Sequence, residues 1–226
     1  MYLNKSAIEW CDYTANPVRG KCQHDCHYCY MKAMNERFKP KYGNGKAEVT
    51  FHSEVLNAIR NHKKPATIFV GSSHDLFGDW CDQYWIDQTL KTGRASSHYI
   101  FLTKNPARLP IRQRYFPFPN QYFGASIDTV ERAKATNPYM DRLDFLSIEP
   151  LLEDVAYDLV GNFRALIIGA QTGKGAIRPE KEWVEHLIEL AEDDCKVFIK
   201  DNLLKLYPEL SHRRELLWPL FTKGAK

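Results

Sequence analysis

Three cysteines lie within eight residues near the N-terminus, and they are the side chains of this sequence best suited to chemistry. Cys22, Cys26 and Cys29 have the spacing C-x3-C-x2-C. Thiolates this close repel one another unless a metal neutralises them, so the spacing predicts a metal site. No fourth cysteine is near in sequence. Three sulfur ligands on a four-iron cluster would leave one iron open to a small molecule.

A zinc site is the alternative interpretation of the same residues. Zinc takes four ligands, and His24 or His27 could complete a set with the three cysteines. We expect both histidines to flank the metal rather than to bind it. Free thiols in a reducing compartment and a disulfide framework are weaker alternatives for a chain of 226 residues. The remaining cysteines are expected to be buried thiols: Cys11, Cys81 and Cys195.

Composition places the chain among ordinary globular proteins. Apolar residues make up 44% and charged residues 26% of the sequence, and the length favours a single domain over residues 1–226. No signal-peptide run begins the sequence, and no apolar stretch is long enough to span a bilayer, so we expect a cytoplasmic protein without a membrane partner. A formal net charge of +3 is too small to establish a nucleic-acid partner.

Short apolar runs alternate with amphipathic segments from one end of the sequence to the other. Such alternation predicts a parallel sheet whose strands are connected by helices. The expected strands are 13–18, 66–71, 99–102, 122–127, 143–148, 165–168 and 196–199. The expected helices are 26–38, 52–61, 80–92, 130–135 and 179–191, with a further helix opened by Pro106. Residues 39–46 are expected to form a polar loop.

Polar residues follow these strands at their carboxyl ends, where the catalytic face of a β/α barrel lies. About six to seven strands fall short of the eight that close a barrel, so the predicted fold is α/β, a partial (open) parallel β/α barrel. A cluster loop is expected at residues 20–30. Residues 203–226 are expected to form a docking tail, with a docking helix beginning near Ser211.

With Tyr28 as the aromatic, the motif C-x3-C-x-aromatic-C resembles the signature of the radical S-adenosylmethionine (radical SAM) superfamily. This resemblance implies a [4Fe-4S] cluster on Cys22, Cys26 and Cys29 whose fourth iron is chelated by S-adenosylmethionine, with Tyr28 against the adenine. It also implies an external one-electron reductant resembling flavodoxin or ferredoxin. Reductive cleavage would then give a 5′-deoxyadenosyl radical that abstracts hydrogen from a substrate. The partial barrel agrees with this interpretation independently of the cysteines.

Stretches across most of the chain are similar to a narrower group, the phage-associated three-cysteine proteins, which are radical SAM-like. The similar stretches are 16–18, 72–77, 102–106, 147–152 and 198–200. One departure is at Gln171, where that group tends to have a carboxylate. The amide at this position argues against a role as an acid, a base or a cation ligand.

The resemblance implies that polar residues at the strand ends hold S-adenosylmethionine: Ser72, Ser73, Asp75, Ser126, Asp128, Gly169 and Gln171. Each has a structural alternative. The first three could form a capped turn. Asp128 could cap the following helix, which we judge the better interpretation. The glycine-rich run that begins at Gly169 could be a flexible turn.

A carboxylate at a buried strand end must be solvated, paired or bound to a ligand. We therefore expect Glu149 to belong to the site, with Lys200 or Lys104 as its ion-pair partner and as a substrate ligand. Lys104, Arg108, Arg112 and Arg114 form a basic group that could follow a phosphate backbone, although a solvated helix face is the commoner explanation.

The predicted function is therefore hydrogen abstraction by a radical SAM enzyme. The substrate would be a nucleotide or a nucleobase in modified phage DNA, for example a thymine derivative. The competing hypothesis is a non-catalytic zinc or iron–sulfur protein that binds nucleic acid or a protein partner. A third is a degenerate barrel that binds S-adenosylmethionine without cleaving it.

Overall fold

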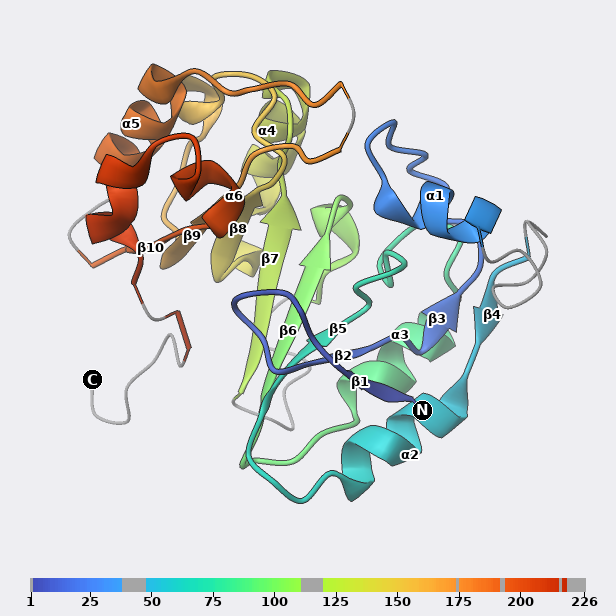
Figure 1. Ribbon diagram of the computed structural model, residues 1–226. Coiled ribbons are helices and arrows are strands. Elements are labelled where there is room, and N and C mark those ends of the chain that lie inside the picture. The colour runs from blue at the N-terminus through green and yellow to red at the C-terminus, as the bar shows by residue number, and fades with distance from the viewer. Residues whose placement is uncertain are drawn as a thin grey trace. The chain divides into compact units, whose positions relative to one another are not determined.

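A computed structural model describes residues 2–37, 48–110, 120–173, 175–191, 194–215 and 217–218 (Figure 1). By internal contacts the chain divides into two compact units, Met1–Gln121 and Tyr122–Lys226. The predicted single-domain organisation stays a prediction.

Unit 1 carries four strands in the order β1-β2-β5-β6. They are β1 (Leu3–Lys5), β2 (Tyr13–Ala15), β5 (Thr67–Val70) and β6 (His98–Thr103). β1 pairs antiparallel with β2, whereas β2, β5 and β6 pair in parallel, with Tyr13 opposite Ile68 and Thr67 opposite His98. Two short strands, β3 (Val18–Arg19) and β4 (Thr50–Phe51), form a separate antiparallel pair.

The helices of unit 1 follow their local sequence. They are α1 (Tyr30–Arg37), α2 (Ser53–Asn61) and α3 (Gln83–Leu90), with a 3-10 helix η1 (Pro106–Arg108). Helix α2 buries Val55, Leu56 and Ile59, which share one face at helical spacing. Helix α3 begins after Asp82, whose carboxylate accepts the amide N–H of Tyr84 at 2.7 Å and so caps the helix.

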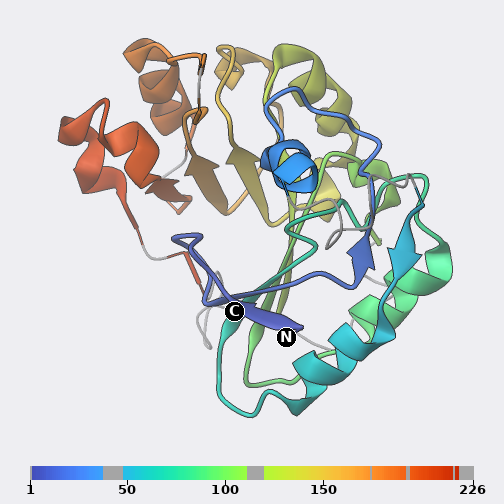
Figure 2. The same ribbon diagram turned by 45° about the vertical axis from the view of Figure 1, so that its right-hand side comes forward.

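Unit 2 carries the strands β7 (Gln121–Ser126), which begins at the unit boundary, β8 (Phe145–Ile148), β9 (Ala165–Ile168) and β10 (Lys196–Ile199). The pairings of β7 with β8, β8 with β9, and β9 with β10 are all parallel. The helices are α4 (Val130–Thr136), α5 (Lys181–Leu190) and α6 (Asp201–Leu204), with 3-10 helices η2 (Asn137–Arg142), η3 (Ala156–Asp158) and η4 (Pro208–Arg213). Helices α4 and α5 lie on the same side of β8, β9 and β10 (Figures 1 and 2).

The central strands are buried along their whole length. Every residue of β7, β8 and β9 is buried, which explains why these strands, apart from Gln121, are continuous apolar or small-residue runs instead of alternating with polar residues. Gly124 in β7 is needed for space, because a Cβ there would lie 2.3 Å from the ring of Phe145. The pattern is that of a parallel sheet covered by connecting helices.

A strand is present in each of the seven predicted ranges, and the parallel pairing within each unit confirms the predicted α/β class. The first prediction, 13–18, needs correction, because β2 ends at Ala15 and Val18 belongs to β3. The sequence pattern missed β1, β3 and β4 as separate strands of two or three residues. Two helix predictions need correction. The helix expected from residue 26 begins at Tyr30, because turns occupy the cysteine segment, and the one opened by Pro106 is a short 3-10 helix. The loop predicted at 39–46 lies outside the described residues.

Among the described residues no helix combines the length and the apolar character needed to cross a bilayer.

The predicted docking helix near Ser211 is wrong for the described part of the tail. The 3-10 helix η4 ends at Arg213, and Arg214 forms an isolated antiparallel bridge with Phe198 of β10. The tail docks through side chains instead: the ring of Trp218 lies 5.0 Å from that of Tyr122 and 5.3 Å from that of Phe145. An aromatic cluster replaces the expected apolar helix face.

Replacing Trp218 by alanine should therefore destabilise the protein strongly. Trp218→Ala removes a buried indole from this cluster and should lower the free energy of unfolding by about 3–5 kcal/mol. Tyr157→Ala is the control, because Tyr157 is 76% exposed and its loss should cost no more than about 0.5 kcal/mol. Urea denaturation of both variants measures the difference; equal effects would mean that the tail does not stabilise the fold.

Candidate functional site

The three cysteines line one pocket in unit 1. Besides Cys22, Cys26 and Cys29 it is lined by Gly20, Lys21, Asp25, Met31, Lys32 and Ser73. Cys29 directly precedes α1, and its amide N–H donates to the carbonyl of Cys26. This turn brings the two cysteines together in the lining of the pocket. The sequence spacing therefore does place three sulfur donors around a shared space.

The three cysteines and the carboxylate-bearing Asp25 line this pocket, whereas neither His24 nor His27 does. The histidine ligand of the zinc alternative is therefore not found among the lining residues. Among the described residues no group of three or more His, Cys, Asp or Glu is arranged to hold a metal ion. The ligand role of the cysteines stays a prediction, which their common pocket supports.

Burial raises the pKa of the Cys22 thiol, and the nearby charges of Asp75 and Cys26 raise it further, against backbone hydrogen bonds that lower it. A thiolate at this position consequently gains from a compensating cation. The amines of Lys21 and Lys32 are near, but Lys32 is paired with Asp25 at 3.0 Å.

Asp75 holds the cysteine segment against the strand ends. Its Oδ2 lies 2.7 Å from Nε2 of His24 and accepts hydrogen bonds from the hydroxyl of Thr103 and the backbone N–H of Lys104, both at 2.9 Å. Its Oδ1 accepts the backbone N–H of Phe77 at 2.9 Å. One largely buried carboxylate thus joins the loop after β5, the end of β6 and the cysteine segment.

A second contact fixes the other end of the cysteine segment. The indole N–H of Trp80 donates to Nε2 of His74 at 2.7 Å, and Nδ1 of His74 lies 3.3 Å from the carbonyl of Gly20. This arrangement fits a neutral ring, and burial lowers the pKa of His74 accordingly. Trp80 also packs edge-on against His24, with ring centroids 4.9 Å apart.

Further contacts tie the predicted cofactor residues of unit 1 together. The amine of Lys104 donates to the hydroxyl of Tyr28 at 2.8 Å and lies 5.5 Å from the centre of that ring. The hydroxyl of Tyr30 donates to the carbonyl of Ser72 at 3.1 Å. The side chain of Asn16 accepts the backbone N–H of Ser73 at 2.9 Å. All predicted site residues of unit 1 therefore belong to one connected group around the cysteines.

In unit 2 the predicted residues Glu149, Lys200 and Gly169 come together. The amine of Lys200 forms an ion pair with Glu149, which confirms one of the two partners expected from the sequence. Gly169 lies beside the pair: a Cβ there would be 3.1 Å from the side chains of both Glu149 and Lys200. A Cβ at this position would therefore crowd both side chains of the pair, and glycine leaves them room.

The other three predicted residues of unit 2 make contacts of their own. Asp128 is not the cap of α4, because Thr129 is the capping residue and Asp128 instead pairs with Arg132 at 2.7 Å. Ser126 is buried as the last residue of β7. The side-chain oxygen of Gln171 accepts the backbone N–H of Ile177 at 3.0 Å, so this amide closes its own loop. Their roles towards S-adenosylmethionine stay predictions.

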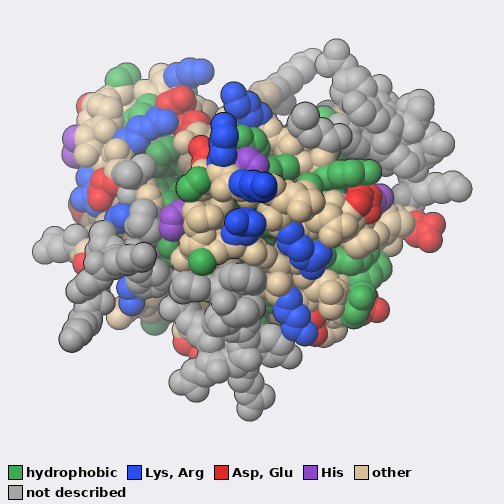
Figure 3. Space-filling view, turned by 90° about the horizontal axis from the view of Figure 1, so that it is seen from below, with side chains coloured by type: hydrophobic (Ala, Val, Ile, Leu, Met, Phe, Trp, Pro, Cys, Tyr) green, Lys and Arg blue, Asp and Glu red, His purple; other side chains and the backbone are tan. Residues whose placement is uncertain are grey.

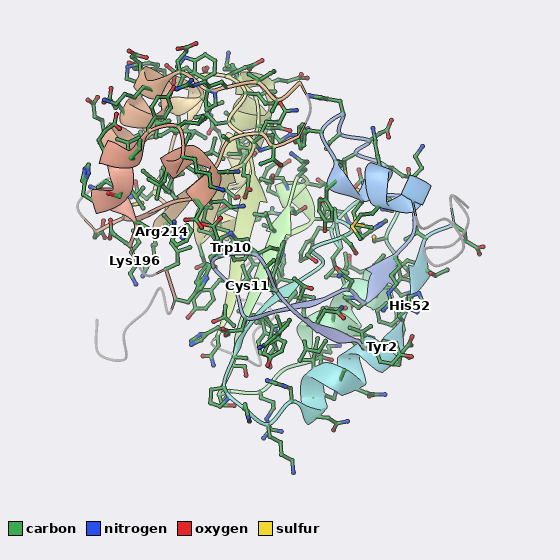
Figure 4. All side chains as sticks on the ribbon, viewed as in Figure 1. Tyr2, Trp10, Cys11, His52, Lys196 and Arg214 are labelled. Atoms are coloured by element: carbon green, nitrogen blue, oxygen red, sulfur yellow. The ribbon has the colours of Figure 1, made fainter. Side chains whose placement is uncertain are left out.

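The other cysteines lie outside the pocket. Cys81 and Cys195 are buried as predicted, and burial raises the pKa of Cys81 to about 12. The prediction is wrong for Cys11, which is half-buried, with its thiol 3.2 Å from the hydroxyl of Ser6; it lies on the loop between β1 and β2, away from α1 (Figure 4). The basic group predicted around Lys104 is not free: the guanidinium of Arg108 donates to the carbonyls of Gly78 and Cys81. Arg112 and Arg114 lie outside the described residues.

Sequence reasoning missed Thr103, Trp80 and the pairing role of His24. Thr103 could have been found, because the carboxyl ends of neighbouring parallel strands lie side by side and β6 ends at Thr103. No spacing rule links Trp80 or His24 to their partners, which lie six and 51 positions away.

Comparison with known proteins comes from a family model and from solved structures. The model of a family described as "Protein of unknown function (DUF5131)" matches residues 5–202. A search of curated proteins gives no match.

The solved structures that match are of spore photoproduct lyase. One with bound AdoMet and dinucleoside spore photoproduct has a TM-score of 0.51 at 13% identity, over 85% of this chain and 64% of that one. A second structure of the same enzyme has a TM-score of 0.52 at 12% identity, over 87% of this chain and 78% of that one. This chain thus spans less than two thirds of the first structure. At such identities the likeness concerns the fold, and it agrees with the predicted partial β/α barrel.

Removing the charge of Asp75 should loosen the cysteine segment. In Asp75→Asn an amide N–H replaces an oxygen among four donors, so at least one buried donor loses its acceptor, and the free energy of unfolding should fall by about 1–3 kcal/mol. Asp79→Asn is the control, because the carboxylate of Asp79 is exposed and accepts a hydrogen bond from the side chain of Asn105, so water can replace what the substitution removes. Urea denaturation compares the two. If Asp79→Asn is the more costly, Asp75 does not hold the segment.

Proposed function

The chain belongs to the DUF5131 family, and we propose that it is a radical SAM enzyme that acts on a nucleotide or DNA-related substrate. The observation that carries this proposal is the shared pocket of Cys22, Cys26 and Cys29 beside the carboxyl ends of parallel strands. The likeness in fold to spore photoproduct lyase, a radical SAM enzyme, supports it from a separate direction.

The three cysteines would hold a [4Fe-4S] cluster and leave one iron for S-adenosylmethionine. When bound, the reduced cluster supplies the electron that cleaves S-adenosylmethionine to a 5′-deoxyadenosyl radical. A flavodoxin- or ferredoxin-like protein would be the reductant. We place the enzyme in the cytoplasm, where the reducing environment keeps such thiols available.

Residues of unit 1 would orient the cofactor without taking part in bond changes. Ser73 lines the pocket next to the cysteines and is our first candidate for contact with S-adenosylmethionine. Lys104 holds the hydroxyl of Tyr28 and so anchors the end of a ring suited to stack on adenine. Asp75 acts through His24 and the backbone of Lys104, as a positioning residue for the cluster loop.

Glu149 and Lys200 would bind the substrate. An ion pair between the ends of β8 and β10, on either side of β9, offers an anion and a cation to a polar substrate, and both side chains keep some exposure, 26% for Glu149 and 14% for Lys200. A nucleotide matches this pair, since its phosphate suits the amine and its base N–H groups suit the carboxylate. One of the similar structures contains a dinucleoside photoproduct, which motivates a thymine derivative as the substrate. The phage-associated three-cysteine group remains our proposal for the narrower family.

A non-catalytic zinc or iron–sulfur binding protein and a barrel that binds S-adenosylmethionine without cleaving it are the competing functions. Metal content and deoxyadenosine formation separate all three.

Loss of any pocket cysteine should abolish cluster binding. Anaerobic reconstitution of the full chain with iron and sulfide should give about four of each per chain, with visible absorption, and dithionite plus S-adenosylmethionine should give 5′-deoxyadenosine. Cys22→Ala, Cys26→Ala and Cys29→Ala should each lose most of the iron and all of the cleavage.

Cys11→Ala is the matched control, because Cys11 lies outside the pocket, and it should keep both properties. One equivalent of zinc without bound iron would support the zinc-binding alternative. A complete cluster that yields no deoxyadenosine with several reductants would support the degenerate barrel.

The Glu149–Lys200 pair should affect substrate binding and stability in different ways. Glu149→Gln or Lys200→Met alone leaves a partly buried charge unpaired and should lower the free energy of unfolding by about 1–3 kcal/mol, whereas the double variant should recover most of it. Binding of a thymidine dinucleotide should weaken by about tenfold or more in Lys200→Met and should not recover in the double variant.

Lys181→Met is the control, because Lys181 pairs at the surface with Glu185 and should affect neither quantity strongly. Unchanged dinucleotide affinity in both single variants would make the pair purely structural.

A further inference from the structure

Five exposed cations gather on two loops at the amino ends of β5 and β6. Arg60, Lys63 and Lys64 lie at the end of α2 and in the loop that leads to β5, and Lys91 and Arg94 lie in the loop between α3 and β6. We call these five residues the basic patch. Figure 3 views the molecule from below, from the side of these two loops, and shows a group of Lys and Arg side chains in the middle of that face.

Direct contacts hold the two loops together. The guanidinium of Arg60 donates to the hydroxyl of Thr92 at 2.9 Å, and that of Arg94 donates to the carbonyl of Arg60 at 3.2 Å. The strands that follow the loops are paired, with the N–H of His98 donating to the carbonyl of Ala66 at 2.9 Å. Cations from two sequence segments are therefore fixed as one surface, and neutral oxygens rather than carboxylates hold the two arginines.

Acidic residues are absent from the sequence around the patch. No Asp or Glu occurs between Glu54 and Asp75, or between Asp87 and Asp128. Among the described residues no carboxylate forms an ion pair with any of the five cations. Asp12, which directly precedes β2, accepts the N–H of Thr67 at the start of β5, and Asp87 accepts from Gln83. These two carboxylates keep their charge, but neither forms an ion pair with a cation of the patch.

We propose that the basic patch binds the phosphate backbone of duplex DNA. Five cations without an ion-paired acid suit a polyanion with regularly spaced charges, because each contact with a phosphate releases a condensed counterion. The loop residues 60–66 and 91–97 contain no Phe, Tyr or Trp, and the ring of His62 already packs edge-on against that of Tyr13, with centroids 4.9 Å apart, so the patch favours phosphates over the stacking of unpaired bases. Contact would be with the backbone and independent of base sequence.

The patch is separate from the candidate active site of unit 1. The cysteine pocket is connected to residues at the carboxyl ends of β5 and β6, whereas the patch lies at their amino ends. The inference does not require the proposed enzymatic function, since backbone binding can be measured whether or not the chain cleaves S-adenosylmethionine. Its role would be to keep the protein on DNA.

Salt-dependent binding of a labelled duplex to the full chain tests this proposal. With five phosphate contacts the affinity should fall by about 500-fold between 50 and 200 mM salt, and with three contacts by about 40-fold. The double variant Lys63→Gln/Lys64→Gln removes two of the five contacts, so its affinity should fall by about 40-fold over this salt range instead of about 500-fold. Lys134→Gln/Lys205→Gln is the matched control, because it also removes two exposed lysines from a chain of formal net charge +3. The control should keep the wild-type salt dependence.

The proposal is overturned if the duplex does not bind, if both double variants lose affinity equally, or if a single strand binds as tightly as the duplex. Binding to phosphatidylserine vesicles in preference to duplex would overturn it in favour of a membrane surface. Thermal unfolding verifies that both double variants are folded, and cluster content measured on the same samples should be unchanged. If the wild-type protein forms no deoxyadenosine, the enzymatic proposal is contradicted, but the DNA-binding proposal is not affected.

Discussion

The carboxylate of Asp75 is the interaction on which the candidate site depends. It is largely buried, and its two oxygens accept from four donors in three segments of unit 1. A buried carboxylate is costly unless such donors surround it, and once they do, none can move without leaving it partly unsatisfied. His24 is one of these donors and lies between Cys22 and Cys26 in the sequence. The carboxylate of Asp75 therefore helps to hold the cysteine segment in place.

The same principle operates in unit 2 with a different result. Glu149 at the end of β8 is balanced by Lys200 after β10, and Gly169 makes room for both side chains at the end of β9. Asn202 adds to this order by donating to the carbonyl of Ala170 and accepting its N–H. Here the charges compensate one another and keep partial exposure, which suits binding of a polar ligand better than holding a loop.

The two ends of the strands in unit 1 differ in chemistry. Their carboxyl ends hold the sulfur pocket and its carboxylate, whereas their amino ends present five cations that form no ion pair with an acid among the described residues. Parallel strands permit this division, because all the loops before the strands emerge on one side and all the loops after them on the other. Cofactor chemistry and backbone binding can therefore be assigned to separate loops of the same strands.

The sequence alone determined the strands, their parallel order and the three cysteines, because periodic apolar runs and close thiol spacing are local patterns. It also indicated that Glu149 needs a partner. Tertiary structure decided which partners meet: Asp75 with His24, Lys104 with Tyr28, and the loop of Lys63 with that of Arg94. Such pairs join residues far apart in the chain, and any of several cations or donors would satisfy the same charge, so only the packing of the strands selects among them.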